Sequence, residues 1–175
     1  MVSIKYANPC AMETTVAVCS ICQKPKSQIE CGLCKSIVCK NCTNFLDGES
    51  FSFLSPVPED LTHLAYCRLC YDAQVAPAME SYQETLQKAQ DIQVFFKSQG
   101  KETRLIKRSD TRFDVPVAID RDETILRLAF FAVQANFNAI IDVEVVGEKV
   151  HSGRYQTSTW KGTAVGAHLK PGRRF

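Results

Sequence analysis

The spacing of the cysteines constrains this chain more than any other feature of its sequence. Eight of its nine cysteines form four Cys-x-x-Cys pairs in the order C-x2-C-x8-C-x2-C-x4-C-x2-C-x24-C-x2-C. Such a pair can point two thiolates at one metal ion, as tetrahedral zinc with Zn–S bonds of about 2.3 Å requires. The pairs are Cys19/Cys22, Cys31/Cys34, Cys39/Cys42 and Cys67/Cys70. They predict two structural zinc ions held by eight thiolates, with Cys10 left alone.

Redox thiols and disulfides are weaker interpretations of these cysteines. One Cys-x-x-Cys pair beside a βαβ pattern is typical of redox proteins, but four pairs without that pattern favour zinc. Disulfides are typical of secreted chains. The N-terminal sequence MVSIKYANPCAMETT does not have the pattern of a signal peptide, and no apolar run approaches the roughly 20 residues of a membrane span. We therefore expect a cytoplasmic, reducing location.

The cysteines also divide the chain into two parts. All nine precede residue 71, and few large apolar side chains lie between the pairs. A core that small usually needs a disulfide or a bound metal ion to stay folded, so metal binding would supply folding free energy. We predict an N-terminal extension at 1–18, a two-zinc module at 19–75, a linker helix at 76–90, an α+β domain at 91–169 and a basic tail at 170–175.

Spacing alone leaves open how the four pairs are shared between two sites. Sequential sites would join Cys19/Cys22 with Cys31/Cys34, and Cys39/Cys42 with Cys67/Cys70. Interleaved sites would join Cys19/Cys22 with Cys39/Cys42, and Cys31/Cys34 with Cys67/Cys70. In both arrangements four thiolates close each site, and no position remains for a catalytic water.

The central run CGLCKSIVCKNC and the closing YCRLCYD resemble FYVE-type zinc fingers over about fifty residues. The resemblance implies an interleaved cross-brace, with Cys19, Cys22, Cys39 and Cys42 on zinc 1 and Cys31, Cys34, Cys67 and Cys70 on zinc 2. PHD and RING fingers share the cross-brace but usually include a histidine ligand, which the central run lacks. The WxxD segment and the basic patch with which FYVE domains bind phosphoinositides are also missing, since residues 1–30 contain no tryptophan and SQIE precedes the third cysteine.

The charge of the first half argues against two classes of partner. Residues 1–75 carry six basic and seven acidic side chains, and two zinc ions with eight thiolates add four negative charges. Such a surface repels anionic lipids and nucleic-acid phosphates. We therefore expect neither membrane phosphoinositides nor nucleic acid as a partner.

The long insert before the seventh cysteine, TNFLDGESFSFLSPVPEDLTHLAY, is rich in aromatic residues. One interpretation is a loop whose aromatic side chains fold back onto the cysteine pairs. The other is a protruding hydrophobic surface for a protein partner. The first is favoured, and His63 is expected at the surface because both sites already have four ligands.

The second half begins with helix and strand signals. Residues 78–90 lack Gly and Pro and favour a helix. Alternation in 91–108 around a turn at 98–100 predicts a β-hairpin. Asp120 with Glu123 forms a capping box for a helix with apolar residues at helical spacing, and Asn136 or Asn138 is its predicted end.

Strands follow that helix. Ala139–Val146 is a β-rich run that Gly147 should break. Tyr155–Trp160 is a second run, which Thr163–Leu169 is expected to continue after Gly162. Asp142 and Glu144 are expected as solvated side chains on one face of a strand. The predicted fold class is therefore a small zinc-stabilised domain joined by a helix to an α+β domain, in which one main helix covers a small antiparallel sheet.

The alanine-rich helix, FNAIIDVEVV and the strand ending in KGTAV resemble the YbjQ-like family, also described as putative heavy-metal-binding, over residues 120–167. The resemblance implies a small homo-oligomer, with a ring of five among the forms. A metal site does not carry over, because no cysteine follows Cys70. His151 and His168 are isolated in sequence and are expected at the surface.

No sequence pattern of a catalytic site is evident, including GxSxG, a glycine-rich phosphate loop or HExxH. We therefore predict a non-enzymatic adaptor with two structural Zn²⁺ ions, whose zinc module binds a protein partner and whose α+β domain forms homo-oligomers. The alternatives are a phosphoinositide-binding FYVE-type protein, a heavy-metal-binding or sensing protein, and a RING-like module associated with a ligase.

Overall fold

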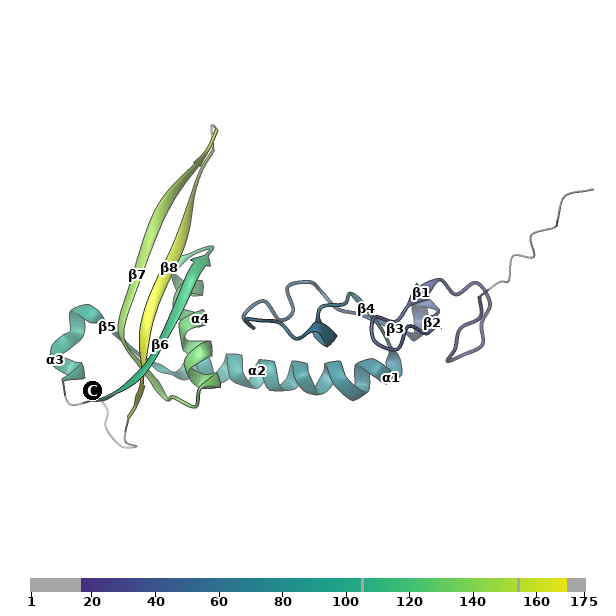
Figure 1. Cartoon of the computed structure of the whole chain (residues 1–175), viewed down its shortest axis with the longest axis horizontal. Coiled ribbons are helices and arrows are strands. Elements are labelled where there is room, and N and C mark those ends of the chain that lie inside the picture. Colours follow the sequence, from purple (N-terminus) through teal and green to yellow (C-terminus); the bar gives the residue numbers. More distant parts are fainter. Residues whose placement is uncertain (1–16, 105, 154, 170–175) are drawn as a thin grey trace, which may run out of the picture. The chain divides into compact units, whose positions relative to one another are not determined.

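The computed structural model describes residues 17–104, 106–153 and 155–169. Cys10 with most of the predicted N-terminal extension, and the predicted basic tail 170–175, lie outside the described residues. The chain forms two compact units (Figure 1). Unit 1 runs up to Ser52 and from Pro56 to Ala76, whereas unit 2 comprises Phe53–Ser55 and the chain from Pro77 onward.

Unit 1 consists of short elements joined by turns. Strand β1 (Ile29–Glu30) pairs with β2 (Ile37–Val38), and β3 (Thr43–Phe45) pairs with β4 (Ala65–Cys67), both antiparallel. The 3-10 helices η1 (Lys40–Cys42) and η2 (Glu59–Leu61) lie between them, and α1 (Arg68–Cys70) leads into the π-helical turn η3 (Tyr71–Val75). One core cluster of this unit is Cys19, Cys31, Val38 and Cys67. Cysteine sulfur therefore occupies positions where larger domains place aliphatic side chains.

Helix α2 (Ala76–Asp91) follows η3 without a break. The predicted helix over 76–90 is present with nearly these bounds. The π-helical turn ends at Val75, two residues before Pro77, which has no N–H to donate to the preceding turn.

Unit 2 is an α+β domain built on a four-stranded sheet with the order β5-β7-β8-β6. Its strands are β5 (Gln93–Phe96), β6 (Lys107–Ala118), β7 (Ala139–Ser152) and β8 (Tyr155–His168). β7 and β8 form a long antiparallel hairpin, β6 pairs antiparallel with β8, and β5 pairs parallel with β7. The sheet is therefore mixed, and the prediction of a purely antiparallel sheet is wrong.

The predicted hairpin in 91–108 is also wrong. β5 pairs with β7 at one edge of the sheet, while β6 lies at the opposite edge. The 3-10 helix η4 (Lys97–Gln99) and α3 (Gly100–Thr103) occupy the predicted turn. β5 is buried on both faces, since Val94 and Phe96 join the main core and Phe95 joins a second cluster. This packing outweighs the local alternation that suggested a hairpin.

The main helix α4 (Arg121–Gln134) begins and ends as its sequence predicts. The Asp120 carboxylate accepts a hydrogen bond from the Glu123 N–H at 2.7 Å, and the Glu123 carboxylate accepts one from the Ile119 N–H. Asn136 ends the helix with φ of 62°, while the Asn136 N–H donates to Val133 O and the Phe137 N–H to Ala132 O. These two bonds form a Schellman motif and satisfy the last carbonyls of the helix.

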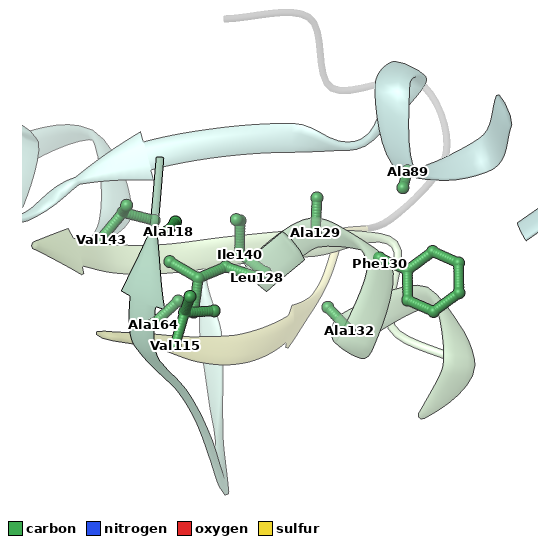
Figure 2. Packing of buried hydrophobic residues seen from close by; sticks show 10 residues of the cluster. All are labelled: Ala89, Val115, Ala118, Leu128, Ala129, Phe130, Ala132, Ile140, Val143 and Ala164. Carbon is green, nitrogen blue, oxygen red and sulfur yellow. The ribbon is translucent and has the colours of Figure 1, made fainter. Parts of the chain in front are cut away.

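The core of unit 2 lies between α4, α2 and one face of the sheet (Figure 2). Leu128 and Phe130 of α4 are fully buried, with Ile140 of β7 and Val115 of β6 in the same cluster. Ala89 brings α2 into this core. The helical spacing of Ile125, Leu128, Ala129 and Ala132 predicted this face, and all of these except the half-buried Ile125 are buried.

Gly147 does not end its strand, contrary to the prediction, whereas the run across Gly162 is continuous as predicted. β7 and β8 continue through both positions. A Cβ at Gly162 would lie 2.6 Å from Thr124 Cγ2 and 3.1 Å from Leu128 Cδ1, and one at Gly147 would lie 3.1 Å from the Trp160 ring. The glycines permit close packing within a continuous hairpin rather than ending a strand.

Neither interpretation of the aromatic insert describes all of it. Phe51 is buried in unit 1, in agreement with a loop that folds back. Phe53 instead packs edge-on against Phe130 at 5.7 Å in unit 2, with the Arg127 guanidinium 4.5 Å from its ring centre. Phe45 at the start of the insert is 59% exposed.

None of the helices in the described part of the chain has both the length and the apolar character that a membrane-spanning helix needs.

Candidate metal centres

The eight paired cysteines gather into two groups of four. Cys19, Cys22, Cys39 and Cys42 form group 1, and Cys31, Cys34, Cys67 and Cys70 form group 2. Within each group the sulfur atoms lie within 4.8 Å of one another. The grouping is interleaved, since each site joins pairs that are not neighbours along the chain. Each group can hold one metal ion.

The first pair of each group is a turn that ends in a left-handed residue. Gln23 and Lys35 directly follow Cys22 and Cys34, and both have φ of 60°. The Gln23 N–H donates to Cys19 O, and the Lys35 N–H donates to Cys31 O. This tight turn keeps both thiols of a pair on the same side. The second pair of each group instead spans the start of a short helix, η1 or α1.

Two backbone hydrogen bonds bring the distant pairs together. The Ser20 N–H donates to Ile37 O at 3.0 Å, and the Gly32 N–H donates to Ala65 O at 2.9 Å. Each donor directly follows the first cysteine of its group, and each acceptor lies two residues before the third. The same backbone hydrogen bond therefore recurs in both groups. It joins the first cysteine pair to the third and the second pair to the fourth, which explains the interleaved grouping.

Sulfur atoms accept hydrogen bonds in the same repeated pattern. The Cys39 N–H donates to Cys19 Sγ at 3.3 Å, and the Cys67 N–H donates to Cys31 Sγ at 3.2 Å. Backbone N–H groups aimed at sulfur stabilise the thiolate form, because hydrogen bonds to the charged state favour it. In each group, therefore, one buried sulfur atom, Cys19 Sγ or Cys31 Sγ, is stabilised in the thiolate form that binds a cation.

The sulfur–sulfur distances fit a tetrahedral ion. Cys22 Sγ and Cys39 Sγ are 3.5 Å apart, and Cys34 Sγ and Cys67 Sγ are 3.8 Å apart. Four sulfurs at about 2.3 Å from a central ion are separated by about 3.8 Å in a regular tetrahedron. A disulfide would require about 2.05 Å. The eight thiols are free, and their geometry matches coordination rather than oxidation.

The thiol pKa values are spread widely within each group. The Cys22 N–H lowers the pKa of Cys19 to about 6, and hydrogen bonds from Ser36 lower the pKa of Cys34 to about 6. Burial raises the pKa of Cys42 and of Cys70 to about 12. A divalent cation offsets the cost of placing several thiolates together, so its binding releases protons.

His63 is not the surface residue that the sequence suggested. It is half-buried, and its ring centre lies 6.1 Å from that of Tyr66. A Cβ at Gly32 would lie 2.3 Å from His63 Cγ. Gly32, between Cys31 and Cys34, therefore provides the space in which the imidazole packs, and His63 supports group 2 without belonging to it.

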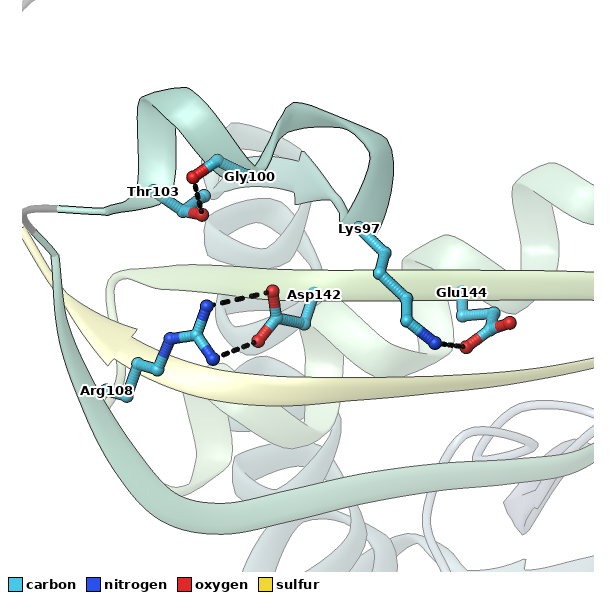
Figure 3. Close-up of polar contacts among 6 residues, drawn as sticks. All are labelled: Lys97, Gly100, Thr103, Arg108, Asp142 and Glu144. Carbon is cyan, nitrogen blue, oxygen red and sulfur yellow. Dashed lines mark hydrogen bonds and ion pairs between the residues drawn. The ribbon is translucent and has the colours of Figure 1, made fainter.

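A second feature is a hollow of about 450 Å³ on the sheet of unit 2, and Figure 3 shows the ion-paired residues Lys97, Arg108, Asp142 and Glu144 that line part of it. Asp142 and Glu144 border it, and both are paired rather than simply solvated as predicted. Arg108 forms two contacts with the Asp142 carboxylate at 3.1 and 3.4 Å, and Lys97 Nζ lies 2.7 Å from Glu144 Oε2. Glu144 also raises the pKa of Lys97 by accepting its hydrogen bond.

The backbone around this hollow is irregular. Asp142 has φ of 53°, and the β7–β8 register shifts between Ile141 and Glu144. The bulge breaks the simple alternation that had placed Asp142 and Glu144 together. Because these carboxylates pair with Arg108 and Lys97, the ion pairs join β7 to β6 and to η4 across the open face.

His168 is exposed as predicted, and the His151 side chain lies outside the described part of the structure.

The fold and the sites define a small α+β protein with a cysteine-rich unit that fits metal stabilisation. Comparison of the chain with protein-family models, with curated proteins and with solved structures finds no match. The four-cysteine groups are compatible with zinc-finger-like modules.

Proposed function

We propose that this chain is a non-enzymatic zinc-binding adaptor. Two structural Zn²⁺ ions hold unit 1 together, unit 1 presents a surface to a protein partner, and unit 2 joins copies of the chain. The observation that carries the proposal is the pair of closed four-cysteine groups. No ligand position in a filled Cys₄ tetrahedron remains for substrate or water, which is typical of structural zinc.

Zinc is favoured over other ions by the ligand set. Four thiolates in a tetrahedron suit zinc or iron, whereas calcium and magnesium take oxygen ligands. The buried sulfur atoms also form part of the core, since Cys19, Cys31 and Cys67 cluster with Val38. Such a core loses its packing when the ion leaves, so the metal has a folding role.

The interleaved grouping supports a FYVE-like cross-brace for unit 1. The phosphoinositide determinants of FYVE domains are absent from the sequence, and protein recognition is the function we propose instead. Unit 1 exposes several large hydrophobic side chains, among them Phe45 at 59%, Leu64 at 63% and Leu69 at 71%. Phe45 pairs with Ala65, the neighbour of Leu64, across β3 and β4. These side chains supply an apolar contact area for a partner.

Unit 2 supports the second half of the proposal. A main helix followed by a long two-stranded hairpin fits a YbjQ-like domain, for which homo-oligomers are implied, including rings of five. Joining copies would raise the avidity of unit 1 without new contacts to the partner.

Native mass spectrometry of the full chain, purified without chelator, tests the metal assignment and the copy number together. We expect two zinc ions per chain in a discrete oligomer. Fewer than two metal ions per chain would contradict the adaptor and favour redox or metal-exchange chemistry at the pairs. Iron in place of zinc would contradict the cofactor assignment.

Metal exchange distinguishes the adaptor from a metal-sensing protein. A structural role predicts that a competing chelator removes zinc only as unit 1 unfolds, as followed by amide resonances. Reversible exchange with unit 1 still folded would favour sensing instead.

A further inference from the structure

The open face of the unit 2 sheet carries a depression that is larger than the hollow described above. A second hollow, of about 390 Å³, adjoins the first one of about 450 Å³, and the two share Asp114, Glu144 and Thr163. Small-molecule sites usually have volumes of about 300–1,000 Å³. Six charged side chains border the first hollow, and the second adds the apolar side chains of Pro116 and Val146. The depression therefore has a charged end and a more apolar end.

Regular strand pairing sets the order of the groups along this depression. Asp114 lies opposite Thr163, and Thr163 lies opposite Glu144, so the three residues form one row across β6, β8 and β7. Neighbouring strands are about 4.8 Å apart, so the row spans about 10 Å. Arg112 lies two residues before Asp114, and Val146 lies two residues after Glu144. Because alternate residues of a strand share a face, a charged group, the row and an apolar group follow one another on this face.

Most charges of the first hollow already have partners. Figure 3 shows the two ion pairs, which engage four of the six charged side chains. Beside the second hollow, Lys161 is paired with Glu148. The side chains of Arg112 and Asp114, by contrast, have no hydrogen bond or ion pair in the part of the chain that the structure describes. The depression therefore offers one guanidinium and one carboxylate, on residues whose Cα atoms are about 7 Å apart.

The strands are irregular where the depression begins. The register of β6 shifts between Arg108 and Arg112, and that of β7 shifts between Ile141 and Glu144. Asp142 lies within the second shift and has a left-handed conformation, with φ of 53°. Bulges and left-handed non-glycine residues occur preferentially next to binding and active sites. The backbone thus points to this face independently of the charges.

We propose that the depression binds a free α-amino acid with an apolar side chain. The ligand carboxylate pairs with the Arg112 guanidinium, which can hold it through two parallel hydrogen bonds. The ligand ammonium group pairs with the Asp114 carboxylate, and the ligand side chain lies toward Pro116 and the exposed Val146. A simple anion or a simple amine would leave one of the two charges unmatched. This site is separate from the cysteine groups and goes beyond the proposed adaptor role.

NMR titration of the full chain, purified without chelator, tests the site with L-leucine as the probe. Amide resonances of 112–116, 144–146 and 161–165 should shift to saturation, whereas those of 19–76 should not move. Isocaproate is leucine without the ammonium group, and isoamylamine is leucine without the carboxylate. Each should bind at least about tenfold more weakly than leucine, because one charged group of the site stays unpaired. Glycine should also bind more weakly, because it has no apolar side chain.

Two variants test the same contacts from the side of the protein. Arg112→Gln should weaken leucine binding about tenfold or more and remove the preference for leucine over isoamylamine. Asp114→Asn should weaken it similarly and remove the preference for leucine over isocaproate. Lys107→Gln and Asp110→Asn make the same charge changes at exposed β6 residues outside the depression and should leave the affinity unchanged. Circular dichroism reports whether each variant is folded.

The inference fails if L-leucine at millimolar concentration leaves these resonances unshifted. It also fails if either analogue or glycine binds as tightly as leucine, or if both variants bind leucine like the wild type. If a variant does not fold, the comparison of the four ligands on the wild type still decides, because it requires no substitution. Normal zinc content without leucine binding would overturn this inference alone and leave the metal proposal standing.

Discussion

Units 1 and 2 differ in the interactions that stabilise their folds. Buried cysteines are central to unit 1, and its strands have only two or three residues. Unit 2 has an aliphatic and aromatic core between helices and a sheet, with strands of up to fourteen residues. Metal ligation should therefore stabilise the first unit, and apolar burial the second. Perturbing the metal groups and the apolar core separately tests whether each unit depends on its own source of stability.

Metal removal should have the largest effect, and it should be confined to unit 1. Structural zinc contributes on the order of 10–16 kcal/mol to folding of small zinc-finger peptides. A strong chelator, or Cys31→Ser, should collapse the amide resonances of residues 19–76 in the full chain. Resonances of unit 2 should stay dispersed in the same heteronuclear NMR spectrum.

Cys10→Ser is the matched control, because Cys10 belongs to no Cys-x-x-Cys pair. We expect it to retain two metal ions. A fully dispersed spectrum for residues 19–76 after complete metal removal would show that unit 1 does not depend on its cysteine groups.

A cavity in the core should have the complementary effect on unit 2. Leu128 is fully buried, and Leu128→Ala should lower the free energy of unfolding by about 2–5 kcal/mol. Denaturant titration followed by circular dichroism measures the change, and native mass spectrometry should still find two metal ions. Leu64→Ala, at a residue that is 63% exposed in unit 1, is the control and should leave unit 2 unchanged.

Added volume at the helix–sheet contact should cost less. Gly162→Ala places a Cβ 2.6 Å from Thr124 Cγ2, and overpacking of this kind costs about 1–3 kcal/mol. Gly100→Ala is the matched control, since nothing lies within 4 Å of its added Cβ. If the two variants had equal thermal stability, α4 would be able to move away from β8 without lowering the free energy of unfolding.

The smallest of these effects should come from the cap of α4. Asp120→Ala removes the hydrogen bond to the Glu123 N–H and should cost about 1 kcal/mol. Asp122→Ala, next to it with a side chain that is 94% exposed, is the control and should change stability by less. The difference between the two midpoints in a urea titration measures the cap, and a larger loss in Asp122→Ala would contradict its assignment.

Patterns that act within one element could be predicted from the sequence. The Asp120–Glu123 box, the stop at Asn136 and the buried face of α4 each depend on residues a few positions apart. Helix geometry fixes how such residues meet. The break after Cys70 likewise indicated where cysteines give way to an ordinary core, and the spacing of the pairs suggested two sites of four sulfurs.

Contacts between segments that are far apart in the sequence could be established only from the folded chain. The family resemblance implied the interleaved grouping, but cysteine spacing left it open, because the grouping depends on the Ser20–Ile37 and Gly32–Ala65 backbone bonds, which no local pattern encodes. The partner of β5 followed from burial of both its faces, and Gly147 proved to be a point of close packing rather than a break. Pairing across long separations is set by which surfaces fit once the chain is compact, whereas caps and helix faces are set by neighbouring residues.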